Sequence, residues 1–106
     1  MGKIFKSYYA VIFTSTQRDN LVGYNEMSQH MEYLTKTQPG FLGLESARNE
    51  LGITVSYWES LNAIKNWKQD TEHLVAQKLG RTKWYQWYHL RICKVEREYE
   101  FNYELN

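Results

Sequence analysis

Two side chains in the second half of the chain, Trp67 and His73, are of types that suit chemistry on an aromatic molecule. An indole ring offers a flat apolar wall, and an imidazole, which titrates near neutral pH, can remove a phenolic proton or bind the resulting anion. On a straight helix the two residues would lie about 120° apart, so a break near Asp70 is needed to bring them into one pocket. The alternative interpretation is structural, with Trp67 in the core of an amphipathic helix and His73 at the surface.

A second group of candidate residues is mostly aromatic and lies between positions 81 and 91. It comprises Arg81, Trp84, Tyr85, Trp87, Tyr88, His89 and Arg91. We predict that Trp84 and Tyr85 line the mouth of a substrate pocket and that Arg81 binds an anionic substituent there. Asn66, next to Trp67, is a further candidate because its amide could orient a substrate oxygen. In the alternative interpretation the aromatic side chains pack a loop onto the fold, and Asn66 faces solvent.

The composition argues against several classes of site and partner. With 13 Lys and Arg against 12 Asp and Glu, the chain has a formal charge of +1 and lacks the basic surface of a general nucleic-acid-binding protein. Its longest apolar stretch, Tyr8–Phe13, is too short to span a membrane and makes a poor secretory signal. Scattered histidines and a single cysteine, Cys93, predict neither a metal site nor an internal disulfide. We therefore expect a cytoplasmic protein with no nucleic-acid or membrane partner.

Hydrophobic periodicity predicts the elements that position these residues, in one domain over residues 1–106. The predicted strands are Tyr8–Ser15, Phe41–Arg48, Ile53–Glu59 and Tyr88–Tyr99; the predicted helices run from about Leu21 to Gln38 and from Ser60 to Leu79, and residues 81–87 fit either helix or loop. The resulting β-α-β-β-α-β order is that of the ferredoxin-like α+β fold, in which both helices cover one face of an antiparallel sheet.

The sheet face opposite the helices determines the partner that we expect. The first strand is apolar on both sides, which is typical of a strand covered on both faces. We assign Tyr8, Ile12, Trp58 and Val95 to the face that the helices leave open. Because an apolar face of this kind needs cover, we predict a homodimer in which two copies pack sheet against sheet.

Several short segments, in their order and spacing, resemble the antibiotic biosynthesis monooxygenase domain family. They are Gln38–Gly43, Thr54–Ser60, Ala63–Lys68, His73, Gly80-Arg81 and Trp84-Tyr85, and the resemblance runs from about Tyr9 to Tyr99. It implies a ferredoxin-like fold that dimerises into an α+β barrel. The family includes cofactor-free oxygenases of polycyclic phenols and quinols, haem-degrading enzymes and proteins of unknown activity.

The haem-degrading branch carries an Asn on the first strand, a Trp on the second helix and a His ten residues after that Trp. Trp67 matches the Trp, but Gln77 stands at the position of the His, and the predicted first strand contains no Asn. The comparison disfavours haem as a cofactor, and we expect no other cofactor.

The function that these observations predict is a cofactor-independent monooxygenase acting on a small phenol- or quinol-like aromatic. Trp67 and His73 would be its catalytic residues, in a pocket between the second helix and the sheet. An electron-rich phenolate reacts with O₂ without a bound cofactor, so the protein need only position and polarise it. The alternatives are a non-catalytic dimer that binds a small ligand or serves under stress, and a haem-degrading monooxygenase. An RNA-recognition module shares the element order, but Leu51–Trp58 lacks its basic and glycine-aromatic signature.

Overall fold

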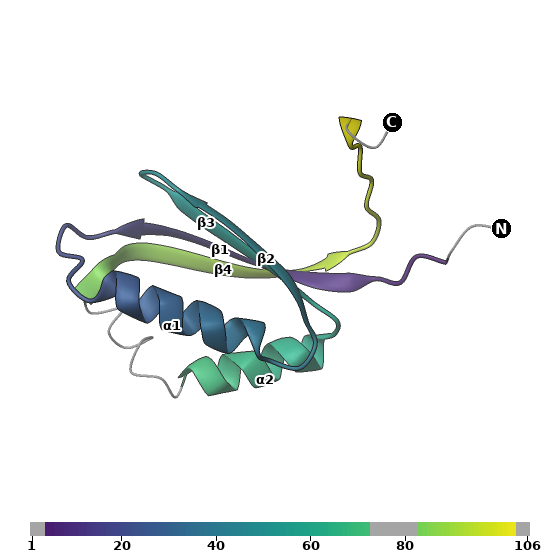
Figure 1. The fold of residues 1–106 in the computed structure, drawn as a ribbon, viewed down its shortest axis with the longest axis horizontal. Coiled ribbons are helices and arrows are strands. Elements are labelled where there is room, and N and C mark those ends of the chain that lie inside the picture. Colours follow the sequence, from purple (N-terminus) through teal and green to yellow (C-terminus); the bar gives the residue numbers. More distant parts are fainter. Residues whose placement is uncertain (1–3, 73–82, 104–106) are drawn as a thin grey trace.

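The computed structural model describes residues 4–72 and 83–103, and within them the chain forms four strands and two helices (Figure 1). The elements in chain order are β1 (Tyr8–Gln17), α1 (Tyr24–Lys36), β2 (Phe41–Arg48), β3 (Gly52–Trp58), α2 (Leu61–Glu72) and β4 (Tyr85–Val95). The predicted β-α-β-β-α-β order and the ferredoxin-like α+β class are confirmed. The last strand begins three residues earlier than predicted, so the segment that the periodicity left ambiguous contributes its final residues to β4.

All neighbouring strands are antiparallel, and their order across the sheet is β2-β3-β1-β4. β1 is therefore a central strand, hydrogen-bonded to a neighbour along both of its edges. Both helices lie on the same side of the sheet (Figure 1). We call this helix-covered side the inner face and the other side the open face.

Two glycines with positive φ set the ends of the connections around α1. Gly23, at φ 82°, stands at the N-cap of the helix. Gly40, at φ 86°, forms the turn into β2, and a Cβ built on it would lie 2.6 Å from the Cβ of Ala63. Only glycine meets both demands at position 40, a backbone conformation that side chains disfavour and a close approach of α2.

The core lies between the inner face and α2. Its buried members are Val11, Trp58, Ala63 and Ile64, all less than 9% exposed. The Trp58 ring packs against those of Phe41 and Trp67, with centroids 5.6 Å and 5.2 Å away. Aromatic rings therefore supply much of the buried area.

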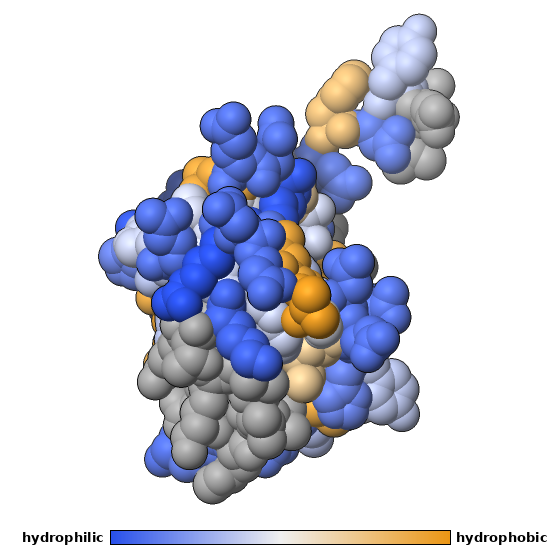
Figure 2. Space-filling view, turned by 90° about the vertical axis from the view of Figure 1, so that its left-hand side faces the viewer, coloured by the Kyte–Doolittle hydropathy of each residue, from blue (hydrophilic) through white to orange (hydrophobic). Residues whose placement is uncertain are grey.

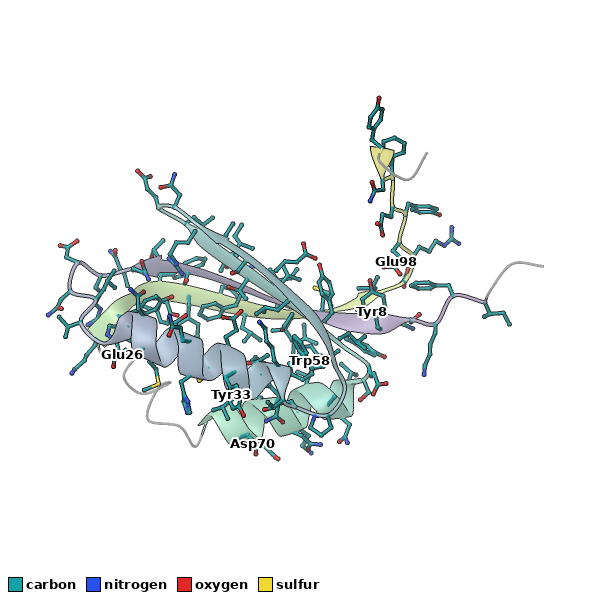
Figure 3. All side chains as sticks on the ribbon, in the orientation of Figure 1. Tyr8, Glu26, Tyr33, Trp58, Asp70 and Glu98 are labelled. Atoms are coloured by element: carbon teal, nitrogen blue, oxygen red, sulfur yellow. The ribbon has the colours of Figure 1, made fainter. Side chains whose placement is uncertain are left out.

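The prediction that Trp58 lies on the open face is wrong. Trp58 pairs with Tyr9 across β3 and β1, so it shares the side of Val11 and points toward the helices (Figure 3). Its side chain is 0% exposed, and its Nε1 donates a hydrogen bond to the Ser56 hydroxyl at 2.9 Å. The face on which Trp58 lies depends on the register between β3 and β1, and the alternation of residues along the third strand does not determine that register.

The open face carries the other alternating set. Ile12 pairs with Val55 of β3 and Arg91 of β4, and Tyr8 packs edge-on against Tyr57 with centroids 5.9 Å apart. The Tyr8 and Ile12 assignments therefore agree with the register. Among the described residues, no helix covers this side (Figure 1).

The segment after β4 leaves the sheet and stands clear of the rest of the molecule (Figures 1 and 2). Its aromatic side chains Tyr99, Phe101 and Tyr103 are 88%, 77% and 82% exposed. At the root of the segment the Tyr8 hydroxyl donates a hydrogen bond to Glu98 (Figure 3), which raises the pKa of Tyr8 to about 12.

Candidate active site

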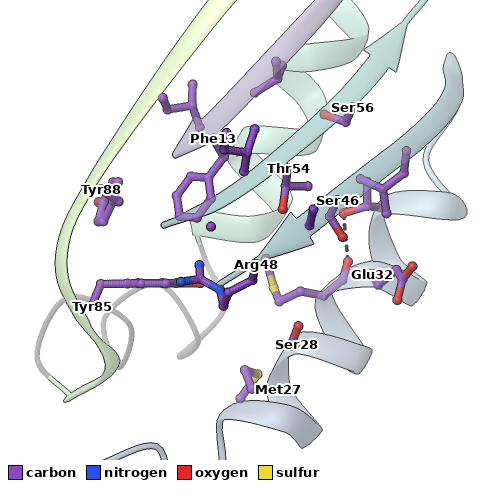
Figure 4. Close-up of a pocket in the computed structure, with 18 of the residues that line it drawn as sticks. Phe13, Met27, Ser28, Glu32, Ser46, Arg48, Thr54, Ser56, Tyr85 and Tyr88 are labelled. Carbon is purple, nitrogen blue, oxygen red and sulfur yellow. Dashed lines mark hydrogen bonds between the residues drawn. The ribbon is translucent and has the colours of Figure 1, made fainter. Parts of the chain in front are cut away.

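A cavity of about 470 Å³ lies between α1 and the inner face of the sheet (Figure 4). Val11 and Ser56, which are 1% and 4% exposed, line its deep end. Exposed residues of α1 and of the β2–β3 hairpin, among them Glu32, Ser46 and Arg48, line its mouth. Sites for small organic ligands typically have volumes of about 300–1,000 Å³, so the cavity is large enough for such a molecule.

The size of the strand side chains explains why the cavity lies where it does. Ser46, Thr54 and Ser56 line it from β2 and β3 and leave space beneath α1. At the α2 end of the same two strands, the rings of Phe41 and Trp58 fill the equivalent space. The sequence analysis placed the pocket against the second helix, whereas most of the cavity lies against α1, with Trp67 as its contribution from α2.

Three aromatic rings from β1 and β4 form one wall. The Phe13 centroid lies 5.5 Å from that of Tyr85 and 5.4 Å from that of Tyr88, and the two tyrosine rings are 5.9 Å apart. Pairs at these distances and tilts hold one another in place. The wall is therefore apolar and presents ring faces and edges to a ligand.

Tyr24 of α1 closes the same end of the cavity. Its ring meets those of Trp84 and Tyr85 edge-on, at 5.8 Å and 6.0 Å. The Trp84 side chain is 4% exposed, and its Nε1 donates to the carbonyl of Val22 at 3.0 Å, which ties β4 to the start of α1. The hydroxyls of Tyr24 and Tyr85 lie 3.4 Å apart. Burial and this hydrogen bond raise the pKa of Tyr85, with nearby Arg48 acting in the opposite direction, so the phenol is neutral at physiological pH.

Trp67 lines the other end of the cavity and is held there by a hydrogen bond. Its Nε1 donates to the Thr35 hydroxyl at 3.0 Å, and that hydroxyl donates to the carbonyl of Met31 at 2.8 Å. The indole packs against that of Trp58 in the core at an interplanar angle of 38°, and the side chain also lines the cavity. Trp67 thus packs against the core and also lines the cavity.

Of the residues that the structure describes, two charged ones line the cavity, Glu32 and Arg48. Glu32 forms an ion pair with Lys36, one turn along α1, with its Oε1 3.2 Å from Nζ. Arg48 donates hydrogen bonds to the hydroxyl and the carbonyl of Ser15, the latter at 3.4 Å. Figure 4 shows the Arg48 side chain reaching toward Tyr85 across the mouth.

The residues predicted from the sequence are only partly brought together. Trp67, Trp84 and Tyr85 all line the cavity. Asn66 is exposed and does not line it, because its position on α2 faces away from the sheet. His73 and Arg81 lie outside the described residues.

Sequence reasoning missed the contribution of α1 and of Arg48. Tyr24, Met27 and Met31 lie along one side of α1, and an apolar stripe of this kind normally packs directly against a sheet. Nothing in the sequence around Arg48 marks it as a pocket residue, because it ends a strand in a polar hairpin. The one available signal was that the facing strand residues are small.

The described residues contain neither a cluster of metal ligands nor a membrane-spanning helix. Within residues 4–72 and 83–103, no group of three or more His, Cys, Asp and Glu side chains is arranged to hold a metal ion. In the same ranges, no helix has the length and apolar character needed to cross a membrane.

The family is established by sequence comparison. A model of the antibiotic biosynthesis monooxygenase family matches residues 8–79. The chain belongs to this family. The resemblance stated from the short segments is thereby confirmed.

Similar proteins have been found both by sequence and by structure. Over 101 residues, this family member is 48% identical to the uncharacterised protein YqjZ of Bacillus subtilis, a match that covers 93% of this chain and 89% of YqjZ. A mutant of SnoaB, a cofactor-independent oxygenase from Streptomyces nogalater, superposes with a TM-score of 0.73 at 10% identity, over 89% of this chain and 97% of SnoaB. A mutant of MhuD with two manganese protoporphyrin IX molecules bound per active site gives 0.64 at 20% identity, over 88% and 99% of the two chains. At such identities the two structures support the fold alone.

Proposed function

We propose that this antibiotic biosynthesis monooxygenase family member is a cofactor-independent oxygenase of a small phenol- or quinol-like aromatic. The observation that carries the proposal is the cavity of about 470 Å³, whose walls are aromatic rings and whose mouth is polar. Phe13, Trp67 and Tyr88 offer the flat apolar surfaces on which a planar ring packs well. The cofactor-independent activity of SnoaB, which shares the fold, is consistent with the proposal.

The reaction needs only the substrate and O₂. The ionised phenol gives an electron to O₂, and the two radicals join as a hydroperoxide on a ring carbon that carries hydrogen. Loss of water then leaves a quinone. One oxygen atom enters the product, and the other leaves as water with the hydroxyl proton and the ring hydrogen. The substrate is itself the reductant, so no other electron donor enters the balance.

In this proposal Trp67 holds the ring and His73 removes the phenolic proton. His73 is assigned on the chemistry of imidazole, whose pKa lies close to neutrality. The cavity supports the rest of the scheme because its buried end excludes water around the reacting ring.

The test is O₂ consumption with two-ring phenols such as 1-naphthol, using protein treated with a chelator. We expect uptake that depends on the protein, and one labelled oxygen atom in the quinone when ¹⁸O₂ is supplied. His73→Ala should lower the rate on the order of 10²-fold while the melting temperature is kept. Binding of the phenol without any O₂ uptake would instead favour the non-catalytic ligand-binding alternative.

We further propose that the protein is a homodimer that packs open face against open face. The proposal is supported by the apolar residues Ile12 and Val55 at the centre of that face and by the absence of any described element that covers it. The exposed aromatic side chains after β4 would gain cover from a second copy in the same assembly.

A further inference from the structure

We propose that the ligand of this cavity is an aromatic carboxylic acid, whose carboxylate is bound by Arg48 at the mouth while its ring lies inside. The inference names the substrate class of the site assigned above, and so it rests on the proposed function for its catalytic meaning. Binding of the carboxylate can be measured without any turnover of the ligand.

The position of Arg48 is built into the β2–β3 hairpin. Arg48 and Gly52 are cross-strand partners, and the guanidinium lies directly over the glycine. A Cβ built on Gly52 would lie 2.1 Å from the guanidinium carbon Cζ. The absence of a side chain at position 52 is therefore what allows the guanidinium to lie across the strand. From there it reaches Ser15 of β1, whose hydroxyl and carbonyl accept its hydrogen bonds.

These contacts hold the guanidinium without neutralising it. A guanidinium has five N–H donors in a planar fork, and the hydrogen bonds to Ser15 use the two terminal nitrogens once each. Within the described ranges, no carboxylate forms an ion pair with Arg48. Glu32, the other charged residue among the described residues that line the cavity, is paired with Lys36 instead. The mouth of the cavity thus presents a fixed positive charge with donors to spare.

The surroundings favour a carboxylate attached to a ring over a free inorganic anion. Beside Arg48 the cavity is lined by the rings of Tyr85 and Tyr88 and by Phe13 behind them (Figure 4). An arginine binds a carboxylate through two parallel N–H···O bonds. The aromatic body would lie against the ring wall and the carboxylate at the polar mouth.

The experiment compares two ligands of nearly the same shape, the negatively charged 6-hydroxy-2-naphthoate and the neutral 6-hydroxy-2-naphthamide. Isothermal titration calorimetry at pH 7 measures the dissociation constant of each for the wild-type protein. We expect the carboxylate to bind about tenfold tighter or more, the difference that one charge-assisted hydrogen-bonded contact supplies. Because the mouth is open to solvent, added salt should reduce this preference.

Three variants distinguish three effects on binding: the charge of Arg48, the position of its guanidinium, and the net charge of the protein. Arg48→Gln removes the charge and should abolish the preference for the carboxylate while the amide binds as before. Gly52→Ala keeps the charge but forces the guanidinium off the strand, and should reduce the preference in the same direction. Lys65→Gln removes one positive charge from an exposed position of α2 outside the cavity and should leave both affinities unchanged. Melting temperatures check that each variant is folded.

The outcomes distinguish this inference from the oxygenase proposal. Equal affinity for the two ligands, a preference that survives in folded Arg48→Gln, or no binding of either compound would overturn the assignment of Arg48. An Arg48-dependent preference without O₂ uptake supports the carboxylate site and counts against the oxygenase. O₂ uptake with a neutral naphthol, together with no preference for the acid, supports the oxygenase and overturns the carboxylate site.

Discussion

At the scale of single residues, the cavity depends on side chains whose polar atoms are occupied elsewhere. The Trp67 N–H is bound by Thr35, the Trp84 N–H by the Val22 carbonyl and the Tyr85 hydroxyl by Tyr24. With these groups satisfied, the ring faces carry no unmet hydrogen bond into the cavity. A planar ligand can therefore pack there without leaving a buried polar atom unpaired.

The two roles of Trp67 can be separated by a pair of variants. Trp67→Phe loses the hydrogen bond to Thr35 and part of the ring surface, so we expect a loss of about 1 kcal/mol in the free energy of unfolding and weaker binding of 1-naphthol. Thr35→Val loses the same hydrogen bond but keeps the indole, and should destabilise the protein by about 1–3 kcal/mol with little change in affinity. Urea unfolding and calorimetry measure the two quantities. Unchanged affinity in both variants would show that Trp67 is structural only.

The buried phenol of Tyr85 predicts how stability depends on alkaline pH. Its pKa is raised in the folded state, so the unfolded chain loses this proton first as the pH rises through the ordinary tyrosine value of 10.0. The contribution is fully present below that pH and is lost above it. Stability should therefore fall above about pH 10, and it should fall less in Tyr85→Phe than in the wild type. Urea unfolding at a series of pH values tests this; parallel curves for the two proteins would contradict it.

At the scale of elements, the sizes of the inner-face side chains divide the sheet into a part packed against α2 and a part that borders the cavity. Bulky residues near the start of β2 and the end of β3 fix α2, and small ones further along the hairpin leave the cavity under α1. The turn at Gly40 controls this division, because it sends the chain from α1 into β2 while passing close to Ala63 of α2.

Two neighbouring glycines provide a matched test of that turn. Gly40→Ala places a side chain at a positive φ and within 2.6 Å of Ala63, so we expect a loss of at least about 1–2 kcal/mol in the free energy of unfolding. Gly43→Ala puts its Cβ 3.7 Å from the Tyr57 ring, an ordinary contact, and should change stability by less than about 0.5 kcal/mol. Chemical denaturation compares the two, and equal losses would exclude the turn as the cause.

At the scale of the whole molecule, the open face and the segment after β4 leave apolar side chains accessible, among them Ile53 at 42% exposed and Tyr99 at 88%. The open face and the segment after β4 are continuous, since Tyr8 of the sheet is hydrogen-bonded to Glu98 at the root of that segment. Exposed surface of this kind is typical of a chain that associates with another copy of itself.

Substitution at the centre of the open face tests the dimer. Ile12→Lys would bury an unpaired charge between two sheets, so we expect it to convert a dimer into a monomer. Val22→Lys, at a position that is 82% exposed and lies in the connection from β1 to α1, adds the same charge and should leave the dimer intact. Sedimentation at micromolar concentration reads out both. A monomeric wild type, or dissociation by Val22→Lys alone, would contradict the proposed interface.

The sequence by itself determined the order and type of the elements, because a period of two or of 3.6 residues and the residues that end a helix are local signals. It also marked Trp67, Trp84 and Tyr85 as candidate site residues by their chemistry. Only the tertiary structure decided which set of each strand faces the helices. Alternation separates Thr54, Ser56 and Trp58 from their neighbours, but the side to which they belong depends on pairing with β1. The same holds for Arg48, whose place at the cavity follows from a glycine opposite it and a serine two strands away, contacts between residues distant in sequence that no local pattern encodes.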